Sequence, residues 1–194
     1  GTMYVTDGTM TLYNAYWTLV NQGVSTTAAY FKLQGENADA TQNASYPRYL
    51  DVDNLIDYML VVFFTGAKDT PLGPPGGDSQ PRNLNIVGNH TELDGFKYLM
   101  HDNEWSLMQQ SGVSLNRVTA VSLTSNTNLA KQSFFNPWWL HLKLKSSSEY
   151  VLHFADRVHK YFFNGGALTP QACTERYQAR IDEINLAIIA ESAR

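Results

Sequence analysis

Residues Leu50 to Leu107 have the sequence LDVDNLIDYMLVVFFTGAKDTPLGPPGGDSQPRNLNIVGNHTELDGFKYLMHDNEWSL, from which a helix, a loop and a β-hairpin are predicted. Its first part predicts a buried helix, because Asp51 or Asp53 can cap the N-terminus and apolar side chains recur at helical spacing. Gly66 is the expected stop. The apolar side chains of this predicted helix are Leu55, Tyr58, Met59, Val62 and Phe63.

A loop and a β-hairpin are expected after the helix. Residues 70–81 are too rich in proline and glycine for a helix or a central strand. Residues 83–87 and 96–101 alternate in polarity, which predicts two strands with a turn near Asp94-Gly95. The second strand delivers Asp102 just past its end, where a loop presents side chains on a rigid support.

The flanking segments predict further helices. Residues 10–22 and 25–34 have helical spacing and each precedes a glycine. Towards the C-terminus, Asn136-Pro137 predicts a capped helix start, Ser146-x-x-Glu149 predicts a capping box, and Thr169-Pro170 predicts a last helix. The buried side of that last helix is expected to carry Tyr177, Ile181, Ile184 and Ile188.

Composition bounds the class of protein. A length of 194 residues fits one domain, residues 1–194, with a sizeable core. The net charge of −4 and the lack of a basic run give no reason to expect a nucleic-acid partner. No apolar run approaches the roughly 20 residues that a membrane span requires. The predicted fold class is mainly α with a small β-hairpin (α+β).

An ordered set of segments resembles the CotH kinase family, the spore-coat-type atypical protein kinases and their secreted bacterial relatives. The resemblance extends from about Tyr30 to the C-terminus and implies the C-lobe of a protein-kinase-like fold, with the N-terminal nucleotide-binding lobe of the same protein expected to be missing from this chain. The segments are YLDVDNLIDYMLVVFFTG, KDTPLG, PRNLN, GFKYLMHDNEWSL and FADRVHKYFFNGGALTP.

The resemblance also implies a function. The parent protein is expected to use ATP and Mg²⁺ to phosphorylate Ser or Thr of secreted or surface proteins, in an extracytoplasmic location. The expected partners are a protein substrate, a nucleotide and the missing lobe. Without that lobe, the isolated chain is expected to be folded but inactive.

Site residues follow from the same resemblance. Asp102 corresponds to the family's Mg²⁺-binding aspartate, and Asn83 to its second metal-binding or catalytic-loop asparagine, with Asn85 in reserve. Asp69 corresponds to the catalytic aspartate of a Gly-Asn-x-Asp motif, although Ala67 replaces its asparagine. Asp78 is the rival, since Asp78-x-x-x-x-Asn83 has the spacing of an ordinary kinase catalytic loop.

Neighbouring residues have less specific expectations. Glu104 is a candidate cofactor-binding residue, because its carboxylate could accept a hydrogen bond from a basic side chain or contact a second metal. His101 could orient Asp102. Each candidate acid also has a structural interpretation, as a turn residue that caps backbone N–H groups or as a solvated loop acid. A zinc site is disfavoured because no His-x-x-His or Glu-x-x-His pair accompanies them.

The competing functional class is a non-catalytic surface or adhesion module on the same scaffold, which the Ala67 departure allows. The Gly73–Gly77 stretch lacks the Gly-Lys-Ser/Thr ending of a phosphate loop. Cys173 has no identifiable base partner, so a nucleophile role is disfavoured.

Overall fold

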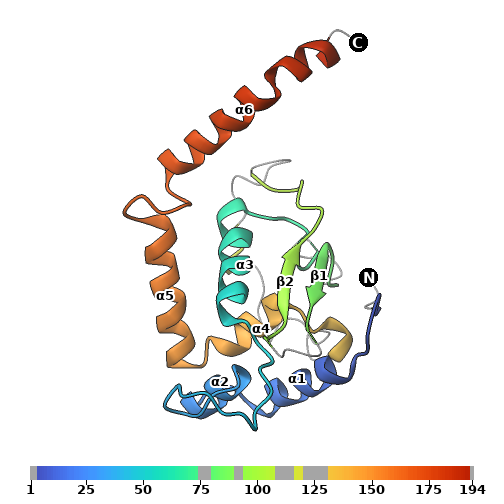
Figure 1. The fold of residues 1–194 in the computed structure, drawn as a ribbon, viewed down its shortest axis with the longest axis vertical. Helices are drawn as coiled ribbons and strands as arrows, with labels where there is room; N and C mark the ends of the chain where they lie inside the picture. Colours follow the sequence, from blue (N-terminus) through green and yellow to red (C-terminus); the bar gives the residue numbers. More distant parts are fainter. Residues whose placement is uncertain (1–3, 74–79, 90–93, 108–115, 120–130, 193–194) are drawn as a thin grey trace. The chain divides into compact units, whose positions relative to one another are not determined.

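A computed structural model describes residues 4–73, 80–89, 94–107, 116–119 and 131–192 (Figure 1). The chain divides into two compact units, Gly1–His153 and Phe154–Arg194. The N-terminal unit contains the Leu50–Leu107 stretch and therefore all the predicted site residues. This division into units does not test the single domain expected from the sequence, which stays a prediction.

The described residues form mainly helices and one small sheet, which confirms the predicted fold class at this level. The likeness to a kinase C-lobe stays a prediction. The N-terminal unit contains α1 (Thr11–Gln22), α2 (Thr27–Leu33), α3 (Val52–Thr65), β1 (Leu84–Val87), β2 (Lys97–Met100), the 3-10 helix η3 (Gln132–Phe134), α4 (Pro137–Leu144) and the start of α5 (Ser148–Phe162). The C-terminal unit contains the rest of α5 and α6 (Pro170–Ser192).

Helix α3 is the buried centre of the N-terminal unit, as predicted. The side chain of Asp51 accepts a hydrogen bond from the N–H of Asn54 at 3.0 Å and so caps the helix. Gly66 ends it in the left-handed conformation, with φ of 62°. Helix α3 packs against β2 and α4 (Figure 1). Its fully or nearly buried residues are Val52, Leu55, Ile56, Tyr58, Met59, Leu60 and Val62.

The sheet is an antiparallel pair, in which Leu84 faces Met100 and Ile86 faces Tyr98. The side chain of Asn54 on α3 satisfies the outer edge of β2. The N–H of Tyr98 donates to Asn54 Oδ1 at 2.6 Å, and Asn54 Nδ2 donates to the carbonyl of Tyr98 at 3.2 Å. One asparagine therefore replaces a neighbouring strand and fixes β2 against α3.

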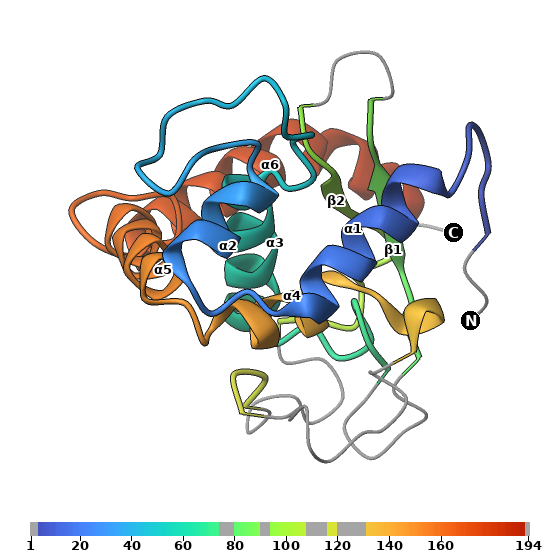
Figure 2. The same cartoon turned by 90° about the horizontal axis from the view of Figure 1, so that it is seen from below.

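Aromatic side chains from α1 join this framework. The ring of Tyr16, which is fully buried, stacks on that of Phe96 with centroids 5.8 Å apart. The hydroxyl of Tyr13 donates to the carbonyl of Phe135 at 2.8 Å. Burial raises the pKa of both tyrosines well above the ordinary value, so the hydroxyls stay neutral. Helices α1 and α2 cover the end of the unit at which α3 begins (Figure 2).

Two details of the predicted C-terminal helices are wrong. Helix α5 begins at Ser148, and the hydroxyl of Ser146 donates to the carbonyl of Lys143 at 2.8 Å, so it serves the end of α4 and not a capping box. Within the C-terminal unit the apolar side of α6 is not buried, since Tyr177 is 69% exposed and Ile188 is 52% exposed. The described part of the C-terminal unit provides no second layer to cover this side.

The predicted capped start of α4 is confirmed, because Asn136 accepts hydrogen bonds from the N–H groups of Trp138 and Trp139 at 2.9 and 3.1 Å.

None of the helices in the described ranges is both long and apolar enough to cross a bilayer.

Replacing Asn54 tests the link between α3 and β2. We expect Asn54→Ala to lower the free energy of unfolding by about 1–3 kcal/mol, because two partly buried main-chain groups of Tyr98 lose their partner. Urea denaturation measures this. The matched control is Asn21→Ala on α1, where the exposed amide bonds only the preceding turn, and we expect a change within about 0.5 kcal/mol. Equal effects of the two variants would contradict the role of Asn54.

The buried His141 on α4 predicts an acid-sensitive fold. Burial, with a smaller contribution from Lys145, lowers the pKa of His141 to about 4 from an unfolded value of about 6.5. The unfolded chain therefore binds the extra proton first. The contribution of neutral His141 to the free energy of unfolding is complete above pH 6.5. As the pH falls towards 4, this contribution, up to about 3 kcal/mol, is lost.

The variant His141→Gln isolates this term from the titration of carboxylates. We expect the difference in free energy of unfolding between the variant and the parent chain to change between pH 7 and pH 4.5, with the parent losing more stability. A constant difference over this range would contradict the assignment to His141.

Candidate active site

The side-chain amide of Asn83 brings together three segments that lie apart in the sequence. Its Nδ2 donates to Oδ2 of Asp69 at 2.9 Å and to the main-chain carbonyl of Asp102 at 3.2 Å. Asp69 follows the end of α3, Asn83 immediately precedes β1, and Asp102 follows β2. These are the three residues that the sequence analysis assigned to catalysis and metal binding.

The hairpin explains why Asn83 and Asp102 meet. Its pairing continues one residue beyond β1 and β2, since the N–H of His101 donates to the carbonyl of Asn83 at 3.2 Å. Both Asn83 and Asp102 then adopt the left-handed conformation, with φ of 49° and 50°. Asparagine and aspartate tolerate this conformation better than other non-glycine residues. Such residues cluster at functional sites, where the surrounding structure holds them in place.

A buried hydroxyl fixes the loop that carries Asp69. The Thr70 Oγ1 donates to the carbonyl of Asn83 at 2.8 Å and lies 3.1 Å from the hydroxyl of Tyr58. Because the proton of Thr70 is used by Asn83, the hydroxyl of Tyr58 is the donor to Thr70. Burial raises the pKa of Tyr58, which keeps this donor protonated. The link from α3 to Asn83 is therefore made of neutral, directed hydrogen bonds.

The loop after β2 is fastened to the end of α3. The N–H of Lys68 donates to the carbonyl of Trp105 at 2.8 Å, and the N–H of Leu107 donates to the carbonyl of Thr65 at 2.7 Å. The ammonium of Lys68 also lies 5.2 Å from the centre of the Trp105 ring. These contacts keep residues 101–107 beside Asp69.

One carboxylate oxygen in this corner lacks a partner. Oδ1 of Asp69 is buried and forms no hydrogen bond within the described part of the chain, whereas Oδ2 accepts from Asn83. A buried acceptor without a partner is costly, and native structures leave few of them. An oxygen of this kind fits a ligand hydroxyl or a cation.

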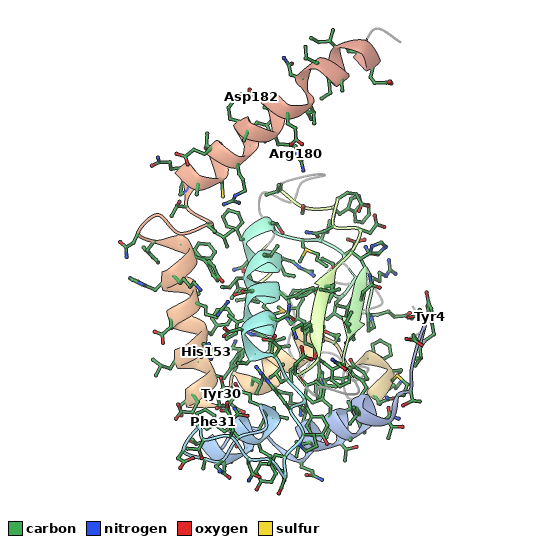
Figure 3. All side chains as sticks on the ribbon, viewed as in Figure 1. Tyr4, Tyr30, Phe31, His153, Arg180 and Asp182 are labelled. Carbon is green, nitrogen blue, oxygen red and sulfur yellow. The ribbon has the colours of Figure 1, made fainter. Side chains whose placement is uncertain are left out.

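A groove of about 690 Å³ leads to Asn83 along β1, within the usual size range of small-molecule sites. Its walls combine the β1 strand with the N-terminal segment that carries Tyr4 (Figure 3). Apolar Val87 and Leu99, which are 51% and 47% exposed, lie on its sheet side.

The free edge of β1 adds polar groups to the groove. Asn83 and His101 form a hydrogen-bonded pair, so the alternation of an antiparallel ladder turns the N–H and C=O groups of Leu84 and Ile86 away from β2. Both residues line the groove. A flat ligand between the apolar walls would therefore meet main-chain donors and acceptors along one side.

The remaining predicted residues have weaker support. His101 and Glu104 are exposed, and neither side chain forms a hydrogen bond to Asp69, Asn83 or Asp102 in the described structure. Asn85 is exposed and lines the groove. Asp78 lies outside the described residues, so the choice between it and Asp69 stays a prediction. The described residues contain no group of three His, Cys, Asp or Glu side chains that could hold a metal.

Sequence analysis missed Arg117, which is 1% exposed. Its Nη2 donates to the carbonyls of Thr70 and Leu72 at 3.4 and 3.3 Å, and its guanidinium lies 4.2 Å from the centre of the Trp138 ring. A single arginine among serines, threonines and asparagines has no pattern that would indicate burial. Most of the irregular stretch in which it lies, residues 109–132, is outside the described residues.

Comparison with known proteins does not identify a family. No protein-family model matches the chain, and no curated protein or solved structure is significantly similar to it. The resemblance to CotH kinases stays a prediction.

Two replacements of Asn83 separate its hydrogen bonds from its backbone conformation. Asn83→Ala removes the bonds to Asp69 and Asp102 and places alanine at φ of 49°, and we expect a loss of about 2–4 kcal/mol in the free energy of unfolding. Asn83→Gly removes the same bonds without the conformational penalty, so its loss should be about 1 kcal/mol smaller. Chemical denaturation checks both. Glycine at least as destabilising as alanine would contradict the left-handed geometry.

Proposed function

We propose that this chain carries the nucleotide- and metal-binding corner of an ATP- and Mg²⁺-dependent protein kinase that phosphorylates Ser or Thr of secreted or surface proteins. The proposal rests on the hydrogen-bonded convergence of Asp69, Asn83 and Asp102. Of these three residues, Asn83 also lines a groove of ligand size. Phosphoryl transfer requires such a corner, because catalysis depends on positioning and on neutralising phosphate charge.

The available atoms fit Mg²⁺. Both amide hydrogens of Asn83 point to acceptors of the protein, so its oxygen is the atom that can meet a cation. The exposed carboxylate of Asp102 is the second candidate ligand. Mg²⁺ in phosphoryl-transfer enzymes typically uses one or two carboxylates together with phosphate oxygens, and it does not need a closed protein cage. When bound, it would neutralise the charge of the phosphates.

Asp69 fits the orienting carboxylate. Asn83 holds Oδ2, so Oδ1, which has no partner among the described residues, is the acceptor for the hydroxyl of a serine or threonine substrate. Because Oδ1 is buried in the ligand-free chain, the substrate hydroxyl reaches it only when the side chains that cover it move. The main chain of the preceding residue is tied to Trp105, so Asp69 has little freedom to turn away. A fixed acceptor lowers the entropic cost of aligning the attacking hydroxyl.

In this proposal the groove itself binds the base and ribose of a nucleotide, so nucleotide binding by this chain does not require the missing lobe that the sequence resemblance implies. The apolar side chains of Val87 and Leu99 lie on the same face of the sheet and can cover one face of a flat base. The main-chain groups of Leu84 and Ile86, which have no hydrogen-bond partner among the described residues, can bond its edge. A nucleotide in this orientation would direct its phosphates to Asn83 at the end of the groove. The protein substrate and the extracytoplasmic location rest on the resemblance of the sequence to CotH kinases.

Nucleotide binding to the ¹⁵N-labelled chain tests this function. We expect millimolar Mg²⁺·ATP to shift the backbone amide signals of residues 84–88 and the side-chain amide signal of Asn83. Asp102→Asn should abolish the Mg²⁺ dependence of these shifts, because the charged ligand is lost. The matched control is Asp94→Asn, which removes the same charge at the opposite end of β2 and should leave the dependence intact.

Two results would contradict the proposal. One is the absence of shifts in residues 83–88 at saturating nucleotide, which is the result expected for a non-catalytic surface or adhesion module. The other is an Mg²⁺ dependence that survives in Asp102→Asn.

A further inference from the structure

Arg117 is a buried cation with few partners. Its Nη2 bonds the carbonyls of Thr70 and Leu72, but Nε and Nη1 are buried without a hydrogen-bond partner among the described residues. A guanidinium has five N–H donors, and leaving some of them unpaired away from water is costly. Arg117 therefore contributes less to the free energy of unfolding than an arginine whose donors all had hydrogen-bond partners would. A role other than stability is a better explanation for a charged residue at this position.

Two features hold the guanidinium in place. Its planar group lies over the face of Trp138, 4.2 Å from the ring centre, and Trp138 is itself fully buried on α4. On its other side it bonds the turn from Thr70 to Leu72. Arg117 therefore connects α4 to the loop that follows Asp69.

The charge of Arg117 acts on Asp69. Burial lowers the pKa of Arg117 to about 10, and the negative charge of Asp69, with a smaller contribution from Tyr58, opposes this effect. The guanidinium remains charged at neutral pH. The two opposite charges attract each other across this corner.

The same turn controls Asn83. Arg117 bonds the carbonyl of Thr70, and the hydroxyl of Thr70 donates to the carbonyl of Asn83. Asn83 in turn donates to Asp69. The chain of contacts from Arg117 to Thr70, to Asn83 and to Asp69 is continuous and has no exposed step between Arg117 and Thr70.

We propose that Arg117 is the positioning residue of the candidate site, which holds the hydrogen-bonded pair of Asp69 and Asn83 through the Thr70–Leu72 turn. Arg117 does not touch the proposed ligands. Its importance for phosphoryl transfer rests on the proposed function, but its effect on the Asp69–Asn83 pair does not, and that pair can be observed without any ligand.

The side-chain amide signals of Asn83 provide the readout. In the parent chain we expect its Nδ2 protons to exchange with solvent at least ten times more slowly than those of the exposed Asn21. Arg117→Met keeps the length of the side chain and removes its charge and its donors. In this variant we expect the Asn83 protons to exchange at least ten times faster than in the parent and their shifts to approach those of an exposed asparagine.

Arg117→Lys restores the charge and a donor, and it should bring the exchange rate to within about threefold of the parent value. A second variant, Thr70→Val, removes the hydroxyl link but keeps Arg117, so it provides an independent test if Arg117→Met does not fold. We expect Thr70→Val to accelerate exchange at Asn83 as well. Arg48→Met, which removes an exposed arginine, is the matched control and should leave the signals unchanged.

The outcomes are distinct. Unchanged Asn83 signals in folded Arg117→Met, or equal acceleration in Arg117→Lys and Arg117→Met, would overturn the positioning role. If Arg117→Met does not fold, unchanged Asn83 signals in Thr70→Val would overturn it. Failure of the parent chain to bind nucleotide would refute the proposed function and would leave these ligand-free measurements valid.

Discussion

The two hydrogen bonds from the side-chain amide of Asn83 are the interaction on which the site depends. They join the loop after α3 to the loop after β2, and they hold Asn83 and Asp102 in the left-handed conformation. Main-chain bonds from Lys68 and Leu107 also fasten these loops together, but the amide of Asn83 is the group that bonds both Asp69 and Asp102. Both donors of the amide face the protein, so in the proposed function its oxygen is the atom that meets a cation.

The rest of the N-terminal unit positions this amide. Buried α3 provides Asn54, which fixes β2, and Tyr58, which bonds Thr70. The stacked aromatic rings of Tyr16 and Phe96 fix the other end of the hairpin. Apolar burial therefore sets the overall position of the strands, and a small number of directed polar bonds sets the position of the site to within the length of a hydrogen bond. Buried donors that have no partner among the described residues, such as Nε and Nη1 of Arg117, lower the stability of this arrangement.

The sequence predicts local structure well where one residue type has one local role. Asp51 and Asn136 cap helices, Gly66 ends one in a left-handed conformation, and alternating polarity gives both strands within one residue of their observed ends. The predicted capping box at Ser146 was wrong, because a serine hydroxyl can bond the end of the preceding helix as readily as the start of the following one. The predicted burial of the apolar side of α6 was wrong, because periodicity shows which residues share a face and does not show what covers that face.

Contacts between distant residues are the part that sequence could not supply. The resemblance to CotH kinases named Asp69, Asn83 and Asp102, but it did not show that Asn83 bonds both partners. Asn54 and Arg117 were missed, because their roles depend on burial against Tyr98 and Trp138, which are 44 and 21 positions away along the chain. The arginine in particular has polar neighbours, which suggest an exposed loop.

A crystal of the chain soaked with Mn²⁺ and a non-hydrolysable ATP analogue would show whether Asp102 and Asn83 hold a metal ion, because the anomalous scattering of Mn²⁺ locates the ion independently of the rest of the structure. We expect an anomalous peak about 2.0–2.4 Å from an oxygen of Asp102 and from Oδ1 of Asn83, with the base of the analogue in the groove along β1. A peak bound only to other carboxylates, or an analogue that binds outside this groove, would contradict this expectation.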